Sequence, residues 1–202
     1  MKIRCIMKLL PEAKSLLGNL DARLFYRSGN PVCILDRDFR ILGYNRAWET
    51  FALDNDGEQV LERWPPGACV LDALPDAVRG YYERKWADTL DTGEPFREEY
   101  DCSSPTRRRR FLATVYPLGG NEALLQSHSL LLEEPLGDDP EQALAEYRNA
   151  DGLMVQCSHC RRVQRQDGSD TWDWVPVLEQ RLLQVTVSHG FCPWCLEHHH
   201  PA

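Results

Sequence analysis

The spacing of apolar residues first predicts a short amphipathic helix near the start of the chain, within residues 1–29. Leucine and alanine side chains recur at helical intervals from Leu9 to Phe25, although Gly18 weakens the pattern. A helix with such a stripe must bury it, so we expect this leader helix to pack on the following domain or on a second subunit.

A pattern of alternating strands and helices predicts a domain of mixed α and β structure over residues 30–134. Apolar runs on either side of Asp36–Asp38 predict a β-hairpin, and Asn45 is suited to cap a helix that ends near Ala52. The clearest helical repeat covers Asp76–Leu90, and the polar stretch before it, rich in glycine and proline, predicts a loop. Three further segments are predicted strands: Pro95–Cys102, Arg108–Leu118 and Ala123–Leu132.

Two polar features of this domain are expected to lie at its surface. The basic run Arg107–Arg110 should alternate between the two faces of a strand, and we expect it to form a solvated edge that discourages strand addition. His128, on the last predicted strand, is expected to be solvated or to lie at an edge rather than to bind iron.

Residues 135–152 are predicted to form a connector helix. Asp139 and Pro140 provide a helix start, and Gly152 provides a stop. The remaining residues, 153–202, are expected to form a separate small module. Its predicted elements are a strand over Leu153–Gln156, a helix near Trp174–Leu183 and a strand over Val185–Val187.

Two C-x-x-C pairs in this module carry the strongest chemical signal of the chain: Cys157, Cys160, Cys192 and Cys195. Two such turns facing each other can offer four thiolates to one tetrahedral metal, for which Zn²⁺ is the default and iron the main competitor. We expect one structural Zn²⁺ per chain, because a segment of about fifty residues has little core of its own. His159 and His189 are candidates to replace a cysteine or to support the ligands, but four thiolates already close a structural site.

A redox role for the same cysteines is an alternative. Cys192-Pro193-Trp194-Cys195 is similar to a dithiol redox motif, but the chain that follows it is too short for the rest of a thioredoxin-like domain. A switch in which oxidation ejects zinc and forms disulfides stays open.

Charge disfavours some functions. Acidic residues outnumber basic ones by 31 to 23, for a net charge of −8, which argues against sequence-independent binding to nucleic acid and against docking on an anionic membrane. Three basic residues gather in the last module (Arg161, Arg162 and Arg165), so a transcriptional regulator that uses the zinc module stays a second alternative. The sequence shows no signal peptide and no apolar run of membrane length, so we expect a cytoplasmic protein.

Residues 31–52, PVCILDRDFRILGYNRAWETFA, resemble the first two strands and the first helix of the PAS family. Residues 99–105 and 110–118 resemble the third and fourth strands of many bacterial sensor PAS domains. The resemblance implies an α+β fold: a five-stranded antiparallel sheet with helices over one face. A PAS interior often holds a ligand, so Trp48, Tyr82 and Trp86 are candidate pocket residues, with a packed core as the alternative.

The last module resembles a small cysteine module that often follows PAS or receiver domains in bacterial signalling proteins. The motifs that carry this resemblance lie at Cys157–Val163, Trp172–Val175 and Ser188–Cys195, the last reading SHGFCPWC. We therefore expect a zinc-ribbon-like module with four cysteines.

Together these resemblances imply a non-enzymatic signal-transduction or sensor protein. The PAS domain would sense a stimulus or form a homodimer with the help of the leader helix, and the zinc module would contact a partner protein. No kinase, cyclase or helix-turn-helix segment is recognisable in the sequence.

Overall fold

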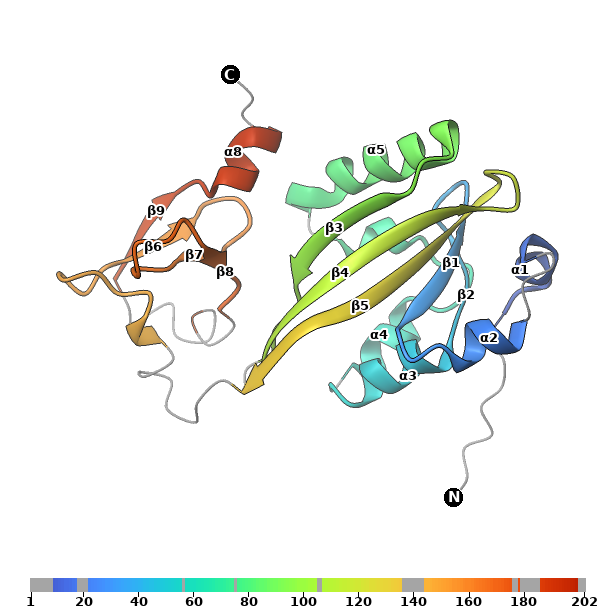
Figure 1. Cartoon of the computed structure of the whole chain (residues 1–202), viewed down its shortest axis with the longest axis horizontal. Helices are drawn as coiled ribbons and strands as arrows, with labels where there is room; N and C mark the ends of the chain where they lie inside the picture. Colours follow the sequence, from blue (N-terminus) through green and yellow to red (C-terminus); the bar gives the residue numbers. More distant parts are fainter. Residues whose placement is uncertain are drawn as a thin grey trace. The chain divides into compact units, whose positions relative to one another are not determined.

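A computed structural model of the chain describes residues 9–17, 22–55, 57–74, 76–104, 107–135, 144–175, 178 and 186–199 (Figure 1). The chain divides into two compact units. The first comprises residues 1–99 and 112–130, and the second comprises residues 100–111 and 131–202. Each unit is described in turn.

A five-stranded antiparallel sheet forms the framework of the first unit, as the sequence predicts. Its strands are β1 (Val32–Asp36), β2 (Ile41–Tyr44), β3 (Phe96–Asp101), β4 (Arg107–Leu118) and β5 (Ala123–Pro135). They lie in the order β2-β1-β5-β4-β3, so the first and last strands of the chain segment pair at the centre of the sheet. The β1–β2 hairpin turns at Asp36, whose Oδ1 accepts hydrogen bonds from the amides of Asp38 and Arg40 at 2.9 and 2.8 Å.

The helices of this unit follow local sequence signals with one exception. Helix α3 (Arg46–Leu53) begins after Asn45, whose Oδ1 accepts from the amide of Trp48 at 3.0 Å, and α5 spans Asp76–Thr92. The segment predicted to be a loop contains the short helix α4 (Glu58–Arg63) and a 3-10 turn at Val70–Ala73. Because α4 contains no fully buried residue and has no side-chain cap, it lacks the pattern from which a helix is recognised. Among the helices in the described ranges, none is long and apolar enough to cross a membrane.

The leader segment forms two helices, α1 (Pro11–Leu16) and α2 (Ala22–Arg27), where the sequence predicts one. Residues 18–21, between them, lie outside the described part of the chain. Within the described residues, apolar side chains of this segment are nevertheless buried, in a cluster that they share with β1, β2 and β5: Leu9, Ala13, Leu17, Phe25, Val32, Ile34, Leu42 and Ala123. The leader therefore packs on the domain that follows it.

The second unit contains a small sheet in the order β8-β7-β6-β9. Its strands are β6 (Met154–Cys157), β7 (Val163–Gln164), β8 (Trp172–Asp173) and β9 (Val187–Gly190), and helix α8 (Pro193–His199) follows β9. Among the described residues, its apolar core contains Leu144, Tyr147, Met154, Val163, Val175 and Leu178. Residues 136–143 of the predicted connector helix and most of the helix expected near residues 174–183 lie outside the described residues.

The basic run of β4 contradicts its predicted role. Strand β4 lies between β5 and β3 in the sheet order, so it is not an edge strand. Within the second unit, Arg109 is 7% exposed and its Nε lies 2.5 Å from Glu133 Oε2. Arg107 Nη1 lies 2.6 Å from the other oxygen of the same carboxylate. The expectation of a solvated edge was wrong because acidic residues remote in sequence neutralise these arginines.

Candidate metal centre

The four cysteines of the two C-x-x-C pairs lie together in the second unit. All four Sγ atoms are within 4.8 Å of one another, and Cys160 Sγ lies 3.6 Å from Cys192 Sγ. A Zn–S distance of about 2.3 Å in a tetrahedral site places neighbouring sulfur atoms about 3.8 Å apart. The cluster therefore has the size and the donor set of a four-thiolate zinc site.

Parallel pairing of β6 with β9 brings the two cysteine pairs together. Cys157, the last residue of β6, pairs with Gly190, the last residue of β9. Because parallel strands end at the same edge of a sheet, the turn after β6 and the turn after β9 start side by side. Each of these turns begins with a C-x-x-C pair, and the second begins at Cys192.

Backbone hydrogen bonds fix the first turn. The Cys157 amide donates to the Arg162 carbonyl at 2.7 Å, and the Arg161 amide donates to the Cys157 carbonyl at 3.0 Å. Arg161 adopts a left-handed conformation with φ of 66°, which is uncommon for a residue other than glycine. The buried Gln156 holds this strained residue, since its Nε2 donates to the Arg161 carbonyl at 3.1 Å.

The second turn leads directly into helix α8. The Leu196 amide donates to the Cys192 carbonyl at 2.9 Å, and the Cys195 amide donates to Cys192 Sγ at 3.4 Å. Hydrogen bonds to this sulfur, foremost from the Cys160 thiol and then from the Cys195 amide, lower the pKa of Cys192 to about 5. The pKa of Cys160 is raised because its thiol is the donor to Cys192, and burial raises the pKa of Cys195 to about 12. The thiols thus differ in pKa: that of Cys192 is lowered, whereas those of Cys160 and Cys195 are raised. A metal would have to displace the protons of Cys160 and Cys195 in order to bind their sulfur atoms.

Apolar and aromatic groups enclose the sulfur atoms. Cys157, Cys192 and Cys195 are buried, Cys160 is partly buried, and the rings of Trp172 and Trp194 pack against them. A closed shell of this kind is typical of a structural site rather than of a catalytic metal with an open position.

The two histidine candidates lie outside the sulfur cluster. His159 is partly buried and His189 is exposed, and neither belongs to the group of possible metal ligands found in the described residues. A different histidine, His198, stacks on Trp194 with 4.5 Å between ring centroids, and its Nδ1 lies 2.8 Å from the Trp194 carbonyl. Its spacing of four residues from Trp194 on one helix is the signal by which this contact is recognisable in the sequence.

The aromatic pocket candidates of the first unit pack into its main core. Trp86 is 5% exposed, and its ring lies 5.7 Å from the rings of both Phe39 and Tyr82. Trp48 stacks on Tyr44 with 6.3 Å between centroids. The structure thus brings Tyr82 and Trp86 together and places Trp48 against a different part of the core.

His128 is not the solvated histidine that the sequence predicts. Its Nε2 atom is shielded from solvent, and its ring meets that of Trp48 edge to face with 5.6 Å between centroids. Burial lowers the pKa of His128 from 6.5 to about 4. The expectation was wrong because α3 carries Trp48 over this part of β5.

Comparisons with known proteins place the first unit. A family model described as PAS fold matches residues 25–126, and no curated protein matches the sequence. Among solved structures, the PAS domain of the Cronobacter turicensis RpfR quorum-sensing receptor in complex with C12:0 is 19% identical, with a TM-score of 0.40 over 52% of this chain and 97% of that one. The PAS domain of Bordetella pertussis BvgS is 18% identical, with a TM-score of 0.41 over 55% of this chain and 84% of that one. A domain of a sensory box sensor histidine kinase/response regulator from Geobacter sulfurreducens is 16% identical, with a TM-score of 0.39 over 53% and 88%.

Proposed function

The chain belongs to the PAS fold family, and from this premise we propose that it is a non-enzymatic signalling protein in which a zinc-loaded cysteine module contacts a partner protein. The observation that carries the proposal is the cluster of four sulfur atoms within 4.8 Å of one another. The PAS domain senses a stimulus or mediates dimerisation. In response, the surface with which the cysteine module contacts its partner protein changes.

Zinc suits this cluster better than a reactive metal. Four thiolates in an enclosed site leave no position for a substrate, and zinc has no redox chemistry of its own. The module needs the metal, because two of its four strands, β7 and β8, are only two residues long. Structural zinc contributes roughly 10–16 kcal/mol in small peptides, far more than such short strands supply.

Exposed apolar residues beside the metal site support a protein partner. Phe191 is 44% exposed and Leu196 is 51% exposed, and each lies next to a cysteine of the second pair. Neighbouring apolar side chains exposed at the surface are typical of protein contact sites. The apolar leader side chains of the buried cluster already pack within the chain, so a homodimer formed with the help of the leader would use its exposed face. Light scattering of the full chain over a range of concentrations tests for that dimer.

Metal analysis of the purified chain tests the proposal. We expect one zinc ion per chain and a colourless solution, and we expect Cys160→Ser and Cys192→Ser to lose the metal. Cys102→Ser is the matched control, since Cys102 lies in the same unit but outside the sulfur cluster. A chain that is free of metal and yet keeps residues 153–199 resistant to protease would overturn the zinc site.

A thiol redox switch is a second candidate, favoured by one contact. Cys160 is partly exposed, and its Sγ lies 3.6 Å from that of Cys192, so a small movement would bring the two to disulfide distance. Hydrogen peroxide would take two electrons from the two thiols, which form a disulfide and release their protons into two molecules of water. Counting free thiols and released zinc after mild peroxide separates this function from a purely structural site.

The structure gives no support to a regulator that binds DNA through the module. Two of the three clustered arginines are engaged within the second unit. Arg162 Nε lies 3.6 Å from Asp101 Oδ2, and Arg165 Nε lies 2.5 Å from Asp173 Oδ2. Carboxylates of the protein therefore already neutralise these two arginines, so they are not available to bind DNA phosphates. A salt-sensitive gel shift with duplex DNA would be needed to revive this alternative.

A further inference from the structure

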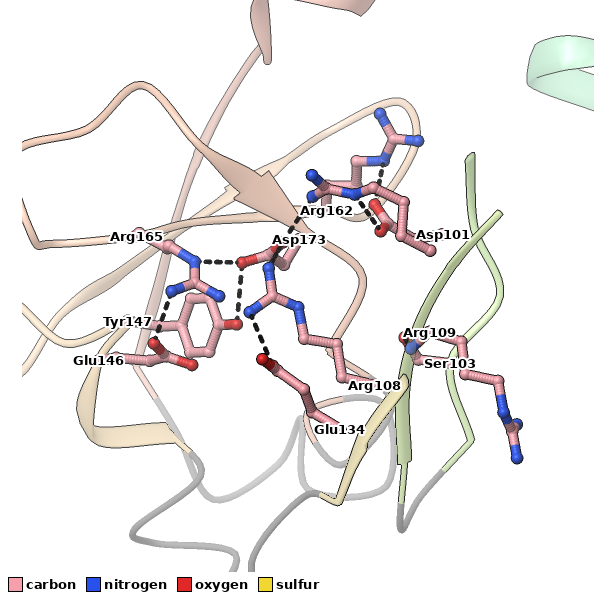
Figure 2. A network of polar contacts seen from close by, with 11 residues as sticks. Asp101, Ser103, Arg108, Arg109, Glu134, Glu146, Tyr147, Arg162, Arg165 and Asp173 are labelled. Carbon is pink, nitrogen blue, oxygen red and sulfur yellow. Dashed lines mark hydrogen bonds and ion pairs between the residues drawn. The ribbon is translucent and has the colours of Figure 1, made fainter. Parts of the chain in front are cut away.

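The second unit contains a buried charge cluster around Asp173, defined by Asp173, Arg108, Arg165 and Tyr147 and called here the Asp173 cluster (Figure 2). The Asp173 side chain is only 1% exposed, so its carboxylate depends on donors from the protein. Arg108 Nη2 lies 2.5 Å from Oδ1 and Arg165 Nε lies 2.5 Å from Oδ2. The Tyr147 hydroxyl donates to Oδ2 at 3.1 Å.

Further charges bring this cluster to neutrality. Arg110 Nη2 lies 3.5 Å from Asp173 Oδ1, Arg165 Nη1 lies 2.9 Å from Glu146 Oε2, and Arg108 Nη1 lies 3.9 Å from Glu134 Oε2. Three guanidinium ions thus face three carboxylates. A buried ion cluster adds little stability, but it favours a single arrangement, because the displacement of one partner leaves another charge unpaired.

The donors to Asp173 come from three separate parts of the chain. Arg108 lies in β4, Tyr147 lies in the segment after β5, and Arg165 directly follows β7. The Arg165 amide donates to the Thr171 carbonyl at 2.9 Å, which closes the connection from β7 to β8. Asp173 therefore links three parts of the second unit through its hydrogen bonds. These parts are the start of β4, the segment after β5, and the cysteine module.

A second ion pair leads from the same strands to the first cysteine turn. Asp101 is the last residue of β3. Its Oδ1 lies 3.4 Å from Arg110 Nε, and its Oδ2 lies 3.6 Å from Arg162 Nε. The Arg162 carbonyl in turn accepts the hydrogen bond from the Cys157 amide at 2.7 Å. A displacement of β3 and β4 therefore acts on the residue that closes the turn around a metal ligand.

Strand β4 is continuous between the two units. Its first residues, Arg107–Phe111, belong to the second unit, and Val115 is 1% exposed in the core of the first. We propose that the Asp173 cluster couples the PAS sheet to the cysteine module, so that displacement of β4 changes how firmly the module holds its metal. This coupling rests on the proposed function, in which the module binds zinc. A shift of β4 pulls Arg108 away from Asp173 and loosens the sheet from which the first cysteine turn starts.

Two arginine variants of the full zinc-loaded chain test the first step. Arg108→Met removes the contact with Asp173, and Arg107→Met is the matched control, because Arg107 precedes it on the same strand and pairs with Glu133 instead. We expect Arg108→Met to speed zinc transfer to an excess of a coloured chelator roughly 10- to 100-fold, the value of a hydrogen bond to a charged group. Arg107→Met should change that rate less than about fivefold. Equal rates for the two variants would overturn the proposal.

A perturbation in the PAS core tests the coupling itself. Val115→Ala leaves a cavity beside β4 and should speed zinc transfer about threefold or more in the parent and in Arg107→Met. In Arg108→Met it should add nothing further, because the coupling contact is already lost. The same acceleration by Val115→Ala in both arginine variants would refute coupling through Asp173. If Val115→Ala does not fold, Ile41→Val in the same core gives a milder perturbation.

Hydrogen exchange separates a failure of coupling from a failure of zinc binding. The Arg165 amide, bonded to the Thr171 carbonyl, reports on the module without any metal. A chain that binds no zinc would refute the proposed function, but Arg108→Met should still exchange this amide faster than Arg107→Met does. Equal exchange in the two variants would refute the coupling whatever the metal content.

Discussion

Acid should destabilise the PAS domain through His128. Burial lowers the pKa of this side chain to about 4, whereas the unfolded chain takes up the proton at 6.5. The neutral ring therefore contributes stability that is fully present above pH 6.5 and is lost as the pH falls towards 4. Below pH 4 the folded form also takes up the proton, and the loss becomes constant.

The size of this effect follows from the shift in pKa. The folded and unfolded values differ by about 2.5 units, and each unit corresponds to about 1.4 kcal/mol. At pH 4 the folded state is already half protonated, which leaves a loss of about 3 kcal/mol in the free energy of unfolding relative to pH 7.5. Other groups titrate in this range, so the quantity to measure is the difference between the parent and His128→Gln.

Two measurements check the prediction. The ring proton signals of His128 in a magnetic resonance titration should shift with a midpoint near 4, and urea unfolding should show the parent losing about 3 kcal/mol against His128→Gln between pH 7.5 and 4. Ser129→Ala is the control on the same strand, because it removes a neutral hydrogen bond from Asn30 and its effect should not depend on pH. A titration midpoint near 6.5 would show that the ring is solvated and would refute the reasoning.

Three further predictions concern the second unit. Arg161→Gly should relieve the left-handed strain of the first cysteine turn and tighten zinc binding by about 1–2 kcal/mol in a chelator competition, whereas unchanged affinity would show that the turn is not strained. Burial is the largest influence on Asp101 and raises its pKa, so the folded chain takes up this proton more readily than the unfolded chain does. In urea unfolding the parent should therefore gain stability relative to Asp101→Asn as the pH falls through the raised pKa, and a constant difference between the two proteins would contradict this. Hydrogen bonds foremost from Arg109 lower the pKa of Glu133, so the parent should lose stability against Glu133→Gln as the pH falls through that lowered pKa, and parallel pH profiles of the two proteins would contradict this.

The elements that could be predicted from the sequence are those with local signals. Asn45 caps its helix because its side-chain oxygen reaches the amide three residues further on, and this spacing is visible in the sequence itself. The strands alternate with turn residues, and the two C-x-x-C pairs are typical of a thiolate metal site through their spacing alone. Helix α4 has no fully buried residue and no side-chain cap, so its sequence lacks these signals.

The charge cluster could not be predicted for a different reason. Arg108 and Asp173 lie 65 positions apart in the sequence, and an ion pair has no spacing rule across such a distance. A basic run on a strand looks the same whether its partners are water or buried carboxylates. Only the folded chain brings Asp173 against β4, and for that reason the sequence predicts a solvated edge where the structure has an ion cluster.

The coupling and the metal depend on each other through the small size of the module. Among the described residues its apolar core is small and two of its strands have two residues each, so the proposed metal, together with the ion cluster, would supply much of what holds the module in one arrangement. In a unit of low stability, the loss of a single contact makes local unfolding more frequent, whereas a unit with a large core would stay folded. Under the proposed function, the loss of one contact at Asp173 would therefore change the retention of zinc at sulfur atoms that Asp173 does not contact.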